Sequence, residues 1–157
     1  MRQIMFRGQL KYDSADLAKK KGEWVYGYYY FRSANNPLSS SAGREFISVN
    51  LCGDWNMSSM VNVEVYNVGE FTGIMDKNRK PIYEDDIIKV HGHTHEDCFT
   101  AWVTYKNGGF WLDRDYLGNW KEYMLEVIGN IHENDPDYID GKNQNYNWGK
   151  YNENFFI

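Results

Sequence analysis

Apolar and polar residues alternate with a period of two through much of this sequence, most clearly in WVYGYYYFR at residues 24–32. Side chains at every second position of a β-strand point to the same face. One face of this strand then holds the even positions 24–30, which are all aromatic, and the other holds Val25, Gly27, Tyr29 and Phe31. Because both faces carry aromatic rings, we expect a strand that is central in its sheet or covered on both sides. Gly27 would leave room for a neighbouring side chain or a bulge.

The same alternation predicts further strands between turn-forming segments. The turn Asn107-Gly108-Gly109 between two apolar runs is a strong β-hairpin signal. Helical periodicity is poor, and only residues 14–21 could form a turn or two of helix, capped by Ser14 or Asp16. The pattern therefore predicts a mainly β fold, or at most a β-rich α+β fold. The strands are expected at residues 4–10, 24–31, 44–52, 60–67, 82–90, 99–105 and 110–112, with a last strand, or a short helix leading into one, within 122–134.

Composition supports this fold class and narrows the possible partners. Aromatic residues make up 17% of the 157 residues, and the net charge of the whole chain is −5. This negative charge argues against a general nucleic-acid-binding protein. The first 50 residues carry eight Lys/Arg and four Asp/Glu, or +4, whereas the remainder carries nine and eighteen, or −9. An anionic partner for the first part would explain this asymmetry. We prefer the simpler interpretation that the two parts face each other, within one chain or between subunits.

Cysteine use and hydropathy indicate a cellular location. The two cysteines, Cys52 and Cys98, have no CxxC-like spacing, so we expect buried or free thiols in a reducing compartment. The N-terminus has no apolar run long enough for a signal peptide, and no segment approaches the roughly 20 apolar residues of a membrane span. We expect a cytoplasmic protein with no membrane partner.

Three segments carry a family resemblance: FRG followed by GEWVYGYY near the start, FTGIMDKNRKPIYEDDIIKV in the middle and EVIGNIHEN near the end. In their order and spacing, residues 2–134 closely resemble the YopX family, small proteins encoded mainly by bacteriophages and prophages. The usual middle pattern of that family is FTGL-x-D-x-x-G-x-x-IYEGDIV. Arg79 and Asp85 stand where this pattern has glycine. We expect both positions to require a positive φ, which Asp tolerates better than Arg.

The resemblance implies a β-rich fold with an SH3-like small barrel in the middle and end of the chain, and it implies self-association. It transfers no enzymatic activity, no catalytic residue and no cofactor. We expect an N-terminal β region at residues 1–68, the SH3-like barrel at 69–134 and an Asn- and Tyr-rich tail at 135–157, together forming one compact unit. The setting it implies is the cytoplasm of a bacterial host cell.

The segment HGHTHEDC, residues 91–98, concentrates the candidate metal ligands. On extended backbone its three imidazoles would point the same way, and imidazole is a good ligand for zinc or copper. A metal site also needs tetrahedral geometry and groups that orient each ring. Because the segment separates two predicted strands and contains turn residues, we expect a loop without a metal. The candidate ligands are His91, His93, His95 and Cys98, with Glu96 and Asp97 as possible additions.

Other catalytic patterns are weak. The acidic run Glu84-Asp85-Asp86 could supply paired carboxylates for acid–base chemistry or for Mg²⁺. Its position directly before Ile87 favours a turn instead. No nucleophile elbow and no glycine-rich phosphate loop is present in the sequence. We therefore expect a protein that is not an enzyme and has no cofactor.

The aromatic strand is the best remaining binding candidate. If its rings are exposed, they could stack on the bases of single-stranded nucleic acid, with basic side chains contacting phosphates. The alternative, which we prefer at this point, is that the rings form the core of a β-rich protein. The residues concerned are Lys19, Lys20, Lys21, Tyr28, Tyr30 and Arg32.

Three functions follow, in order of preference. The first is a non-enzymatic interaction protein that forms a homo-oligomer and binds a host or phage protein, with Phe155, Phe156 and Ile157 at the chain end docking on a neighbouring subunit. The second is a single-stranded nucleic-acid-binding accessory protein that uses the basic, aromatic N-terminal region. The third is a metal-dependent hydrolase built around residues 91–98.

Overall fold

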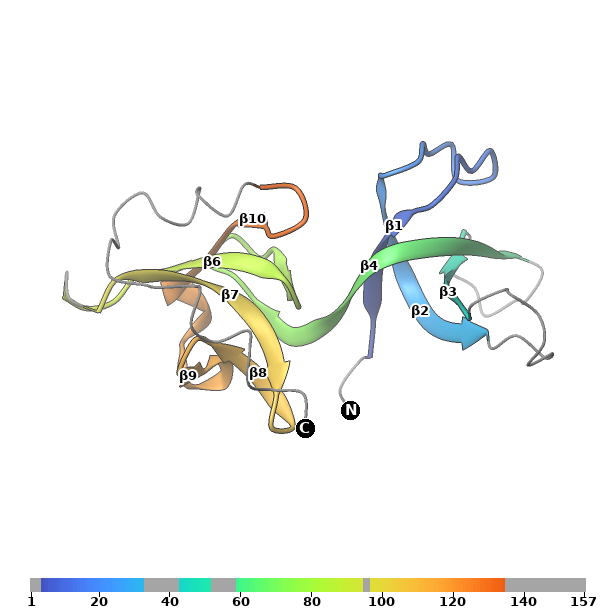
Figure 1. Cartoon of the computed structure of the whole chain (residues 1–157). Coiled ribbons are helices and arrows are strands. Elements are labelled where there is room, and N and C mark those ends of the chain that lie inside the picture. The colour runs from blue at the N-terminus through green and yellow to red at the C-terminus, as the bar shows by residue number, and fades with distance from the viewer. Residues whose placement is uncertain (1–3, 33–42, 52–58, 95–96, 135–157) are drawn as a thin grey trace.

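A computed structural model describes residues 4–32, 43–51, 59–94 and 97–134. The ribbon forms two lobes joined by one long strand (Figure 1). We call the part built by β1–β3 and the first half of β4 the N-terminal lobe, and the part built by the end of β4 and β5–β10 the C-terminal lobe. Strands dominate both lobes, which confirms the mainly β prediction. Among the described residues, no helix has the length and hydropathy needed to cross a membrane.

The N-terminal lobe contains four antiparallel strands that close on themselves. They are β1 (Phe6–Leu10), β2 (Trp24–Arg32), β3 (Arg44–Asn50) and β4 (Met60–Met75). Each pairs with the next, and β1 also pairs with β4, so the pairings form a ring. The alternating apolar residues of these strands fill its centre, with Leu10, Val25, Ile47, Val63 and Val65 buried together.

The C-terminal lobe contains a second antiparallel sheet, together with β5, which pairs with β4 of the first sheet, and has its own core. Its elements are β5 (Pro81–Tyr83), β6 (Asp86–Val90), β7 (Phe99–Lys106), β8 (Gly109–Leu112), β9 (Asp115–Tyr116), the 3₁₀ turns η2 (Leu117–Asn119) and η3 (Glu122–Met124), and β10 (Leu125–Asn130). The sheet order is β10-β6-β7-β8-β9. Its core consists of Ile82, Ile88, Val90, Ala101, Val103, Phe110, Leu112, Leu117 and Leu125.

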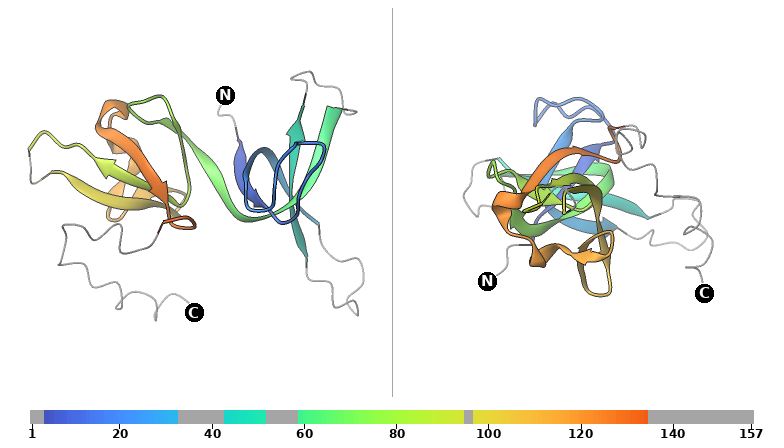
Figure 2. Two further views of the ribbon diagram at one scale, coloured as in Figure 1. Left: turned by 90° about the horizontal axis from the view of Figure 1, so that it is seen from above. Right: turned by 90° about the vertical axis from the view of Figure 1, so that its left-hand side faces the viewer.

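Strand β4 runs through both lobes (Figure 2). Its first half pairs with β1 and β3, and its end pairs with β5 through Phe71 opposite Tyr83. The buried Ile82 of β5 belongs to the C-terminal core. The boundary expected between residues 68 and 69 therefore falls inside this strand. The division into regions and the SH3-like assignment of residues 69–134 stay predictions.

Several local expectations are confirmed. Asn107 and Gly108 both have positive φ, 50° and 77°, and connect β7 to β8 as the sequence predicted. Residues 122–134 form a 3₁₀ turn leading into β10. Residues 14–21 do not form a helix: Ser14 and Lys19 instead exchange backbone hydrogen bonds across a tight turn. No i+4 hydrogen-bond ladder can begin in a segment that folds back after four residues.

Strand β2 is central, as expected, because it lies between β1 and β3, but it is not covered on both faces. Val25, on the odd face, is buried in the ring, whereas the even-numbered tyrosines lie on its outer surface and are exposed. The period-two pattern identified the two faces correctly, but the ring of only four strands covers one of them. The expectation for Gly27 is confirmed, because a Cβ there would lie 2.1 Å from the carbonyl oxygen of Ser48.

The two departures from the family's glycine pattern have the expected backbone conformation. Arg79 has φ 66° and Asp85 has φ 68°. Both lie in tight turns, Arg79 between β4 and β5 and Asp85 between β5 and β6. Non-glycine residues in this region are strained because Cβ approaches the following carbonyl. The glycines of the family pattern are therefore explained by backbone geometry.

Candidate functional site

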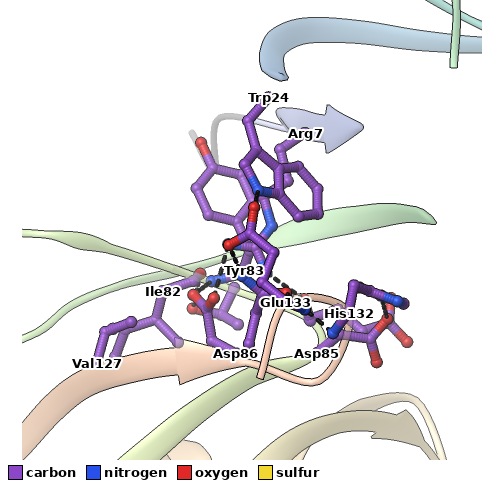
Figure 3. A network of polar contacts seen from close by, with 12 residues as sticks. Arg7, Trp24, Ile82, Tyr83, Asp85, Asp86, Val127, His132 and Glu133 are labelled. Atoms are coloured by element: carbon purple, nitrogen blue, oxygen red, sulfur yellow. Dashed lines mark hydrogen bonds and ion pairs between the residues drawn. The ribbon is translucent and has the colours of Figure 1, made fainter. Parts of the chain in front are cut away.

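The two lobes meet at a buried arginine. The guanidinium of Arg7, on β1, lies with Nη1 2.6 Å from Oδ1 of Asp86 on β6, and Nη2 donates to the carbonyl oxygen of Glu84 at 3.1 Å. The side chains of this ion pair are 7% and 1% exposed. The guanidinium carbon also lies 4.5 Å from the ring centroid of Trp24 and 5.0 Å from that of Tyr83. Arg7 is thus held by an anion and two aromatic rings (Figure 3).

A second set of hydrogen bonds joins the same surfaces. Trp24 Nε1 donates to Glu133 Oε1 at 2.6 Å, and Asn130 donates to the other oxygen of Glu133 at 2.6 Å. Gln9 of β1 reaches the same carboxylate at 3.5 Å. Because Trp24 and Gln9 belong to the N-terminal lobe and Glu133 to the C-terminal lobe, these contacts fix the lobes relative to each other. We call Arg7, Trp24, Tyr83, Asp86 and Glu133 the junction cluster.

Burial determines the titration of this cluster. Removal from water raises the pKa of the Asp86 carboxyl, and the Arg7 guanidinium and the Tyr83 backbone N–H oppose that rise. Burial also raises the pKa of the Tyr83 phenol to about 12. The Tyr83 ring packs against Tyr26 and Phe71, with centroids 5.7 and 5.6 Å away. The junction cluster is therefore a structural arrangement whose carboxylates are already occupied by contacts within the protein.

The segments that carry the family resemblance meet in this cluster. Arg7 comes from FRG, Trp24 from GEWVYGYY, Tyr83 and Asp86 from IYEDDIIKV, and Glu133 from EVIGNIHEN. They are distant in the sequence and adjacent in space. At these positions, the residues that carry the family resemblance are therefore also the residues that join the two lobes.

The exposed part of the site is the outer surface of β2. Tyr26, Tyr28 and Tyr30 are 48%, 41% and 38% exposed. Tyr30 lies opposite Phe46 of β3, and their rings stack with centroids 5.2 Å apart and planes 10° from parallel. We call Tyr26, Tyr28, Tyr30 and Phe46 the aromatic face. It begins next to the junction cluster, where Tyr26 contacts Tyr83, and continues to the far end of the lobe.

Basic side chains surround the far end of the aromatic face. Arg32 and Arg44 are directly opposite each other on β2 and β3, an arrangement of like charges that destabilises a sheet unless an anion is near. Glu64 of β4 lies 3.6 Å from Arg44 and 2.7 Å from Lys11. The Glu64 carboxylate therefore contacts two cationic side chains, Lys11 and Arg44, and a third cationic side chain, Arg32, lies beside them.

The predicted basic residues are in a different place. Lys19 lies 3.6 Å from Glu23 and Lys20 lies 3.3 Å from Asp13, and the backbone N–H of Lys21 donates to Asp13. These lysines precede β2, whereas Arg32 ends it. The structure thus does not bring Lys19, Lys20 and Lys21 together with Tyr30 and Arg32. The predicted Phe155, Phe156 and Ile157 lie outside the described residues.

The described residues of the histidine segment, 91–94 and 97–98, lie between β6 and β7 and belong to neither strand, as expected for a loop. His91 Nε2 lies 2.6 Å from Glu126 Oε2, and Lys77 Nζ lies 2.8 Å from the same oxygen. His93 and Cys98 are exposed, and the Cys98 thiol donates to the carbonyl of Thr94. His95 lies outside the described residues, within which no three His, Cys, Asp or Glu side chains are grouped so that they could hold a metal ion.

The acidic run forms the predicted turn. Its carboxylates do not form a pair: Asp85 contacts His132 at 2.8 Å, whereas Asp86 points to Arg7. Sequence reasoning found Tyr28, Tyr30 and Arg32 but missed Lys11, Arg44, Phe46 and Glu64, because their proximity depends on the pairing of β2, β3 and β4 and on that of β4 with β1. The available signal was the succession of alternating strands, since consecutive strands commonly pair with each other.

The class of protein is a two-lobed, all-antiparallel β protein with a buried arginine at the lobe junction and an exposed aromatic face. Comparison with protein families gives the particular family: a model described as YopX protein matches residues 18–137, so the chain belongs to the YopX family. Among solved structures, protein EF1440 from Enterococcus faecalis is similar, with 19% identity, a TM-score of 0.47, and coverage of 85% of this chain and 96% of that one. Comparison with curated proteins gives no match.

Proposed function

We propose that this YopX-family chain is a non-enzymatic binding protein whose partner docks on the aromatic face. The observation that carries the proposal is the exposure of Tyr26, Tyr28 and Tyr30 on one face of one strand, at 48%, 41% and 38%. Contiguous exposed aromatic rings are uncommon on monomeric proteins unless they bind something. Tyr and Arg are also the residue types that contribute most to binding energy at interfaces.

The engagement of the polar groups supports a role without catalysis. Asp86 pairs with Arg7, Glu133 accepts from Trp24 and Asn130, and Glu126 accepts from Lys77. A general acid or base must reach a substrate with a free proton or lone pair. Each of these carboxylates is instead used to hold one part of the chain against another.

The junction cluster supports binding by fixing the geometry of the surface. Because Arg7 and Trp24 hold β1 and β2 against the C-terminal lobe, the aromatic face has a defined orientation relative to that lobe. A surface that is already ordered loses less conformational entropy when a partner binds. The setting we propose, on the basis of the family resemblance, is a phage- or prophage-encoded accessory factor in the bacterial cytoplasm.

The experiment combines solution mass with recovery of bound macromolecules. The full chain and its Tyr28→Ser/Tyr30→Ser variant are compared by light scattering and by capture from a bacterial lysate, with and without nuclease. Tyr123→Ser, which alters a ring that is 65% exposed in the C-terminal lobe, is the matched control. We expect the wild type and the control to self-associate or to retain a macromolecule, and the double variant to lose it. Equal behaviour of all three proteins would refute the proposed function.

A further inference from the structure

We infer that the partner of the aromatic face is single-stranded nucleic acid, an inference that rests on the proposed function. Three observations point to it: the spacing of the tyrosines, the surplus of positive charge beside them, and the polar groups between the strands. Each is found on the outer surface of the N-terminal lobe. A second copy of the chain or another protein is the competing occupant, and the experiment below distinguishes them.

The spacing of the rings suits flat bases. Tyr26, Tyr28 and Tyr30 occupy every second position of β2, so their Cα atoms are roughly 7 Å apart, twice the rise of about 3.4 Å per residue. This is also twice the distance of about 3.4 Å between successive bases of one stacked strand. The tyrosines therefore recur along β2 at the spacing of every second base of a stacked single strand. The stacked pair of Tyr30 and Phe46, with ring planes 10° apart, extends this platform onto β3.

The charges beside the rings suit a phosphate backbone. Lys11, Arg32 and Arg44 carry three positive charges and Glu64 one negative charge, a surplus of two within the group joined by the Arg32–Arg44 register and the two contacts of Glu64. Arg44 is 58% exposed and its distance to Glu64 is 3.6 Å, so its guanidinium remains accessible. An anion between Arg32 and Arg44 would relieve their mutual repulsion. A polyanion supplies such anions along its length.

Polar side chains lie between the rings and β4. Ser48 is directly opposite Tyr28, and its hydroxyl donates to the side-chain oxygen Oδ1 of Asn62. Asn62 itself is exposed. Amide and hydroxyl groups beside stacked bases can bond to their edges. A surface of rings, cations and amides is more typical of nucleic-acid binding than of an apolar homodimer interface.

The test measures binding of a labelled oligothymidine to the full chain by fluorescence anisotropy over a range of salt concentrations. We expect binding that weakens as salt rises, and a roughly tenfold or greater loss of affinity in Tyr28→Ser/Tyr30→Ser, because each ring stacks on a base. Tyr123→Ser should bind like the wild type. A duplex competitor should displace the oligonucleotide poorly, because its bases are already stacked.

Two charge variants test the phosphate contacts. Arg32→Gln/Arg44→Gln should lower the slope of log affinity against log salt by about 1.4, because each phosphate contact on a single strand contributes about 0.7. Lys19→Gln/Lys20→Gln removes the same charge from the loop before β2, and should leave the slope nearly unchanged. Equal slope changes in both variants would show non-specific attraction to the lobe and would overturn the inference.

The outcome for the inference is separable from that for the proposed function. If the oligonucleotide does not bind at low salt while solution mass or protein capture depends on Tyr28 and Tyr30, the partner is a protein and the inference fails alone. If neither nucleic acid nor protein binding depends on these tyrosines, both fail. Circular dichroism and thermal unfolding of each variant establish that a loss of binding is not a loss of fold.

Discussion

Arg7 and Asp86 form a buried ion pair between the two lobes, with Nη1 and Oδ1 2.6 Å apart. The first 50 residues carry a net charge of +4 and the remainder −9, and this pair is one point at which the two parts face each other within one chain.

Replacing Asp86 by Asn should destabilise the protein by about 3 kcal/mol or more, because it leaves the guanidinium of Arg7 buried without a counter-charge. Urea unfolding monitored by tryptophan fluorescence measures this. Lys20→Gln is the comparison: it breaks an exposed ion pair whose side chains are 81% and 60% exposed, so its effect should stay under about 1 kcal/mol. Similar unfolding free energies for the two variants would contradict the role given to the junction cluster.

Replacing Arg79 by Gly should stabilise the protein by roughly 0.5–1 kcal/mol. The residue has φ 66°, a conformation that costs an L-residue about 1–2 kcal/mol, and part of the gain is offset by the greater freedom of glycine in the unfolded chain. Arg79→Ala keeps the Cβ and removes the charge, so it should show no gain. Equal stabilisation by Ala and Gly would mean that charge, not backbone strain, is responsible.

Stability should fall as the pH rises from 10 to 12, and Tyr83 should account for part of that fall. Burial raises the pKa of its phenol from 10.0 to about 12, so the unfolded chain loses this proton before the folded chain does. The resulting stability is fully present below pH 10 and is lost as the pH rises through about 12. In Tyr83→Phe the fall should be smaller by about 2 kcal/mol. Tyr123→Phe, at a 65% exposed ring, should follow the wild type.

Replacing Gly27 by Ala should destabilise the N-terminal lobe by roughly 2–3 kcal/mol. The new Cβ would lie 2.1 Å from the Ser48 carbonyl oxygen, so β2 and β3 would have to separate. Thermal unfolding measures the loss. Tyr28→Ala changes an exposed residue one position along the same strand and should cost much less; a small effect of Gly27→Ala would show that the ring of strands yields readily.

Much of the fold could be predicted because alternation and turn chemistry are local. The hairpin at Asn107-Gly108 requires two consecutive residues with positive φ, and the sequence places the two residue types that tolerate them there. The strand at residues 60–67 was predicted too short. The prediction ended it at Asn67, yet β4 continues to Met75.

The exposed face of β2 could not be predicted from its own residues. Both faces are aromatic, so hydrophobicity does not distinguish the covered face from the open one. The answer depends on Gly27 and Gly8, whose missing side chains let β3 and β4 approach from the side of Val25. The cations of the candidate site depend likewise on strand register, which places Arg44 opposite Arg32 and brings Glu64 to Lys11.

The continuity of β4 limits how this protein can be dissected. Its 16 residues complete the ring of the first lobe and supply the partner of β5 in the second. A fragment ending near residue 68 would lose Gly69 and Glu70, which pair with Arg7 and Phe6 of β1, and one beginning near residue 76 would leave Pro81–Tyr83 without its neighbouring strand. Expression trials on separate halves would therefore need overlapping pieces, each retaining the whole of Met60–Met75.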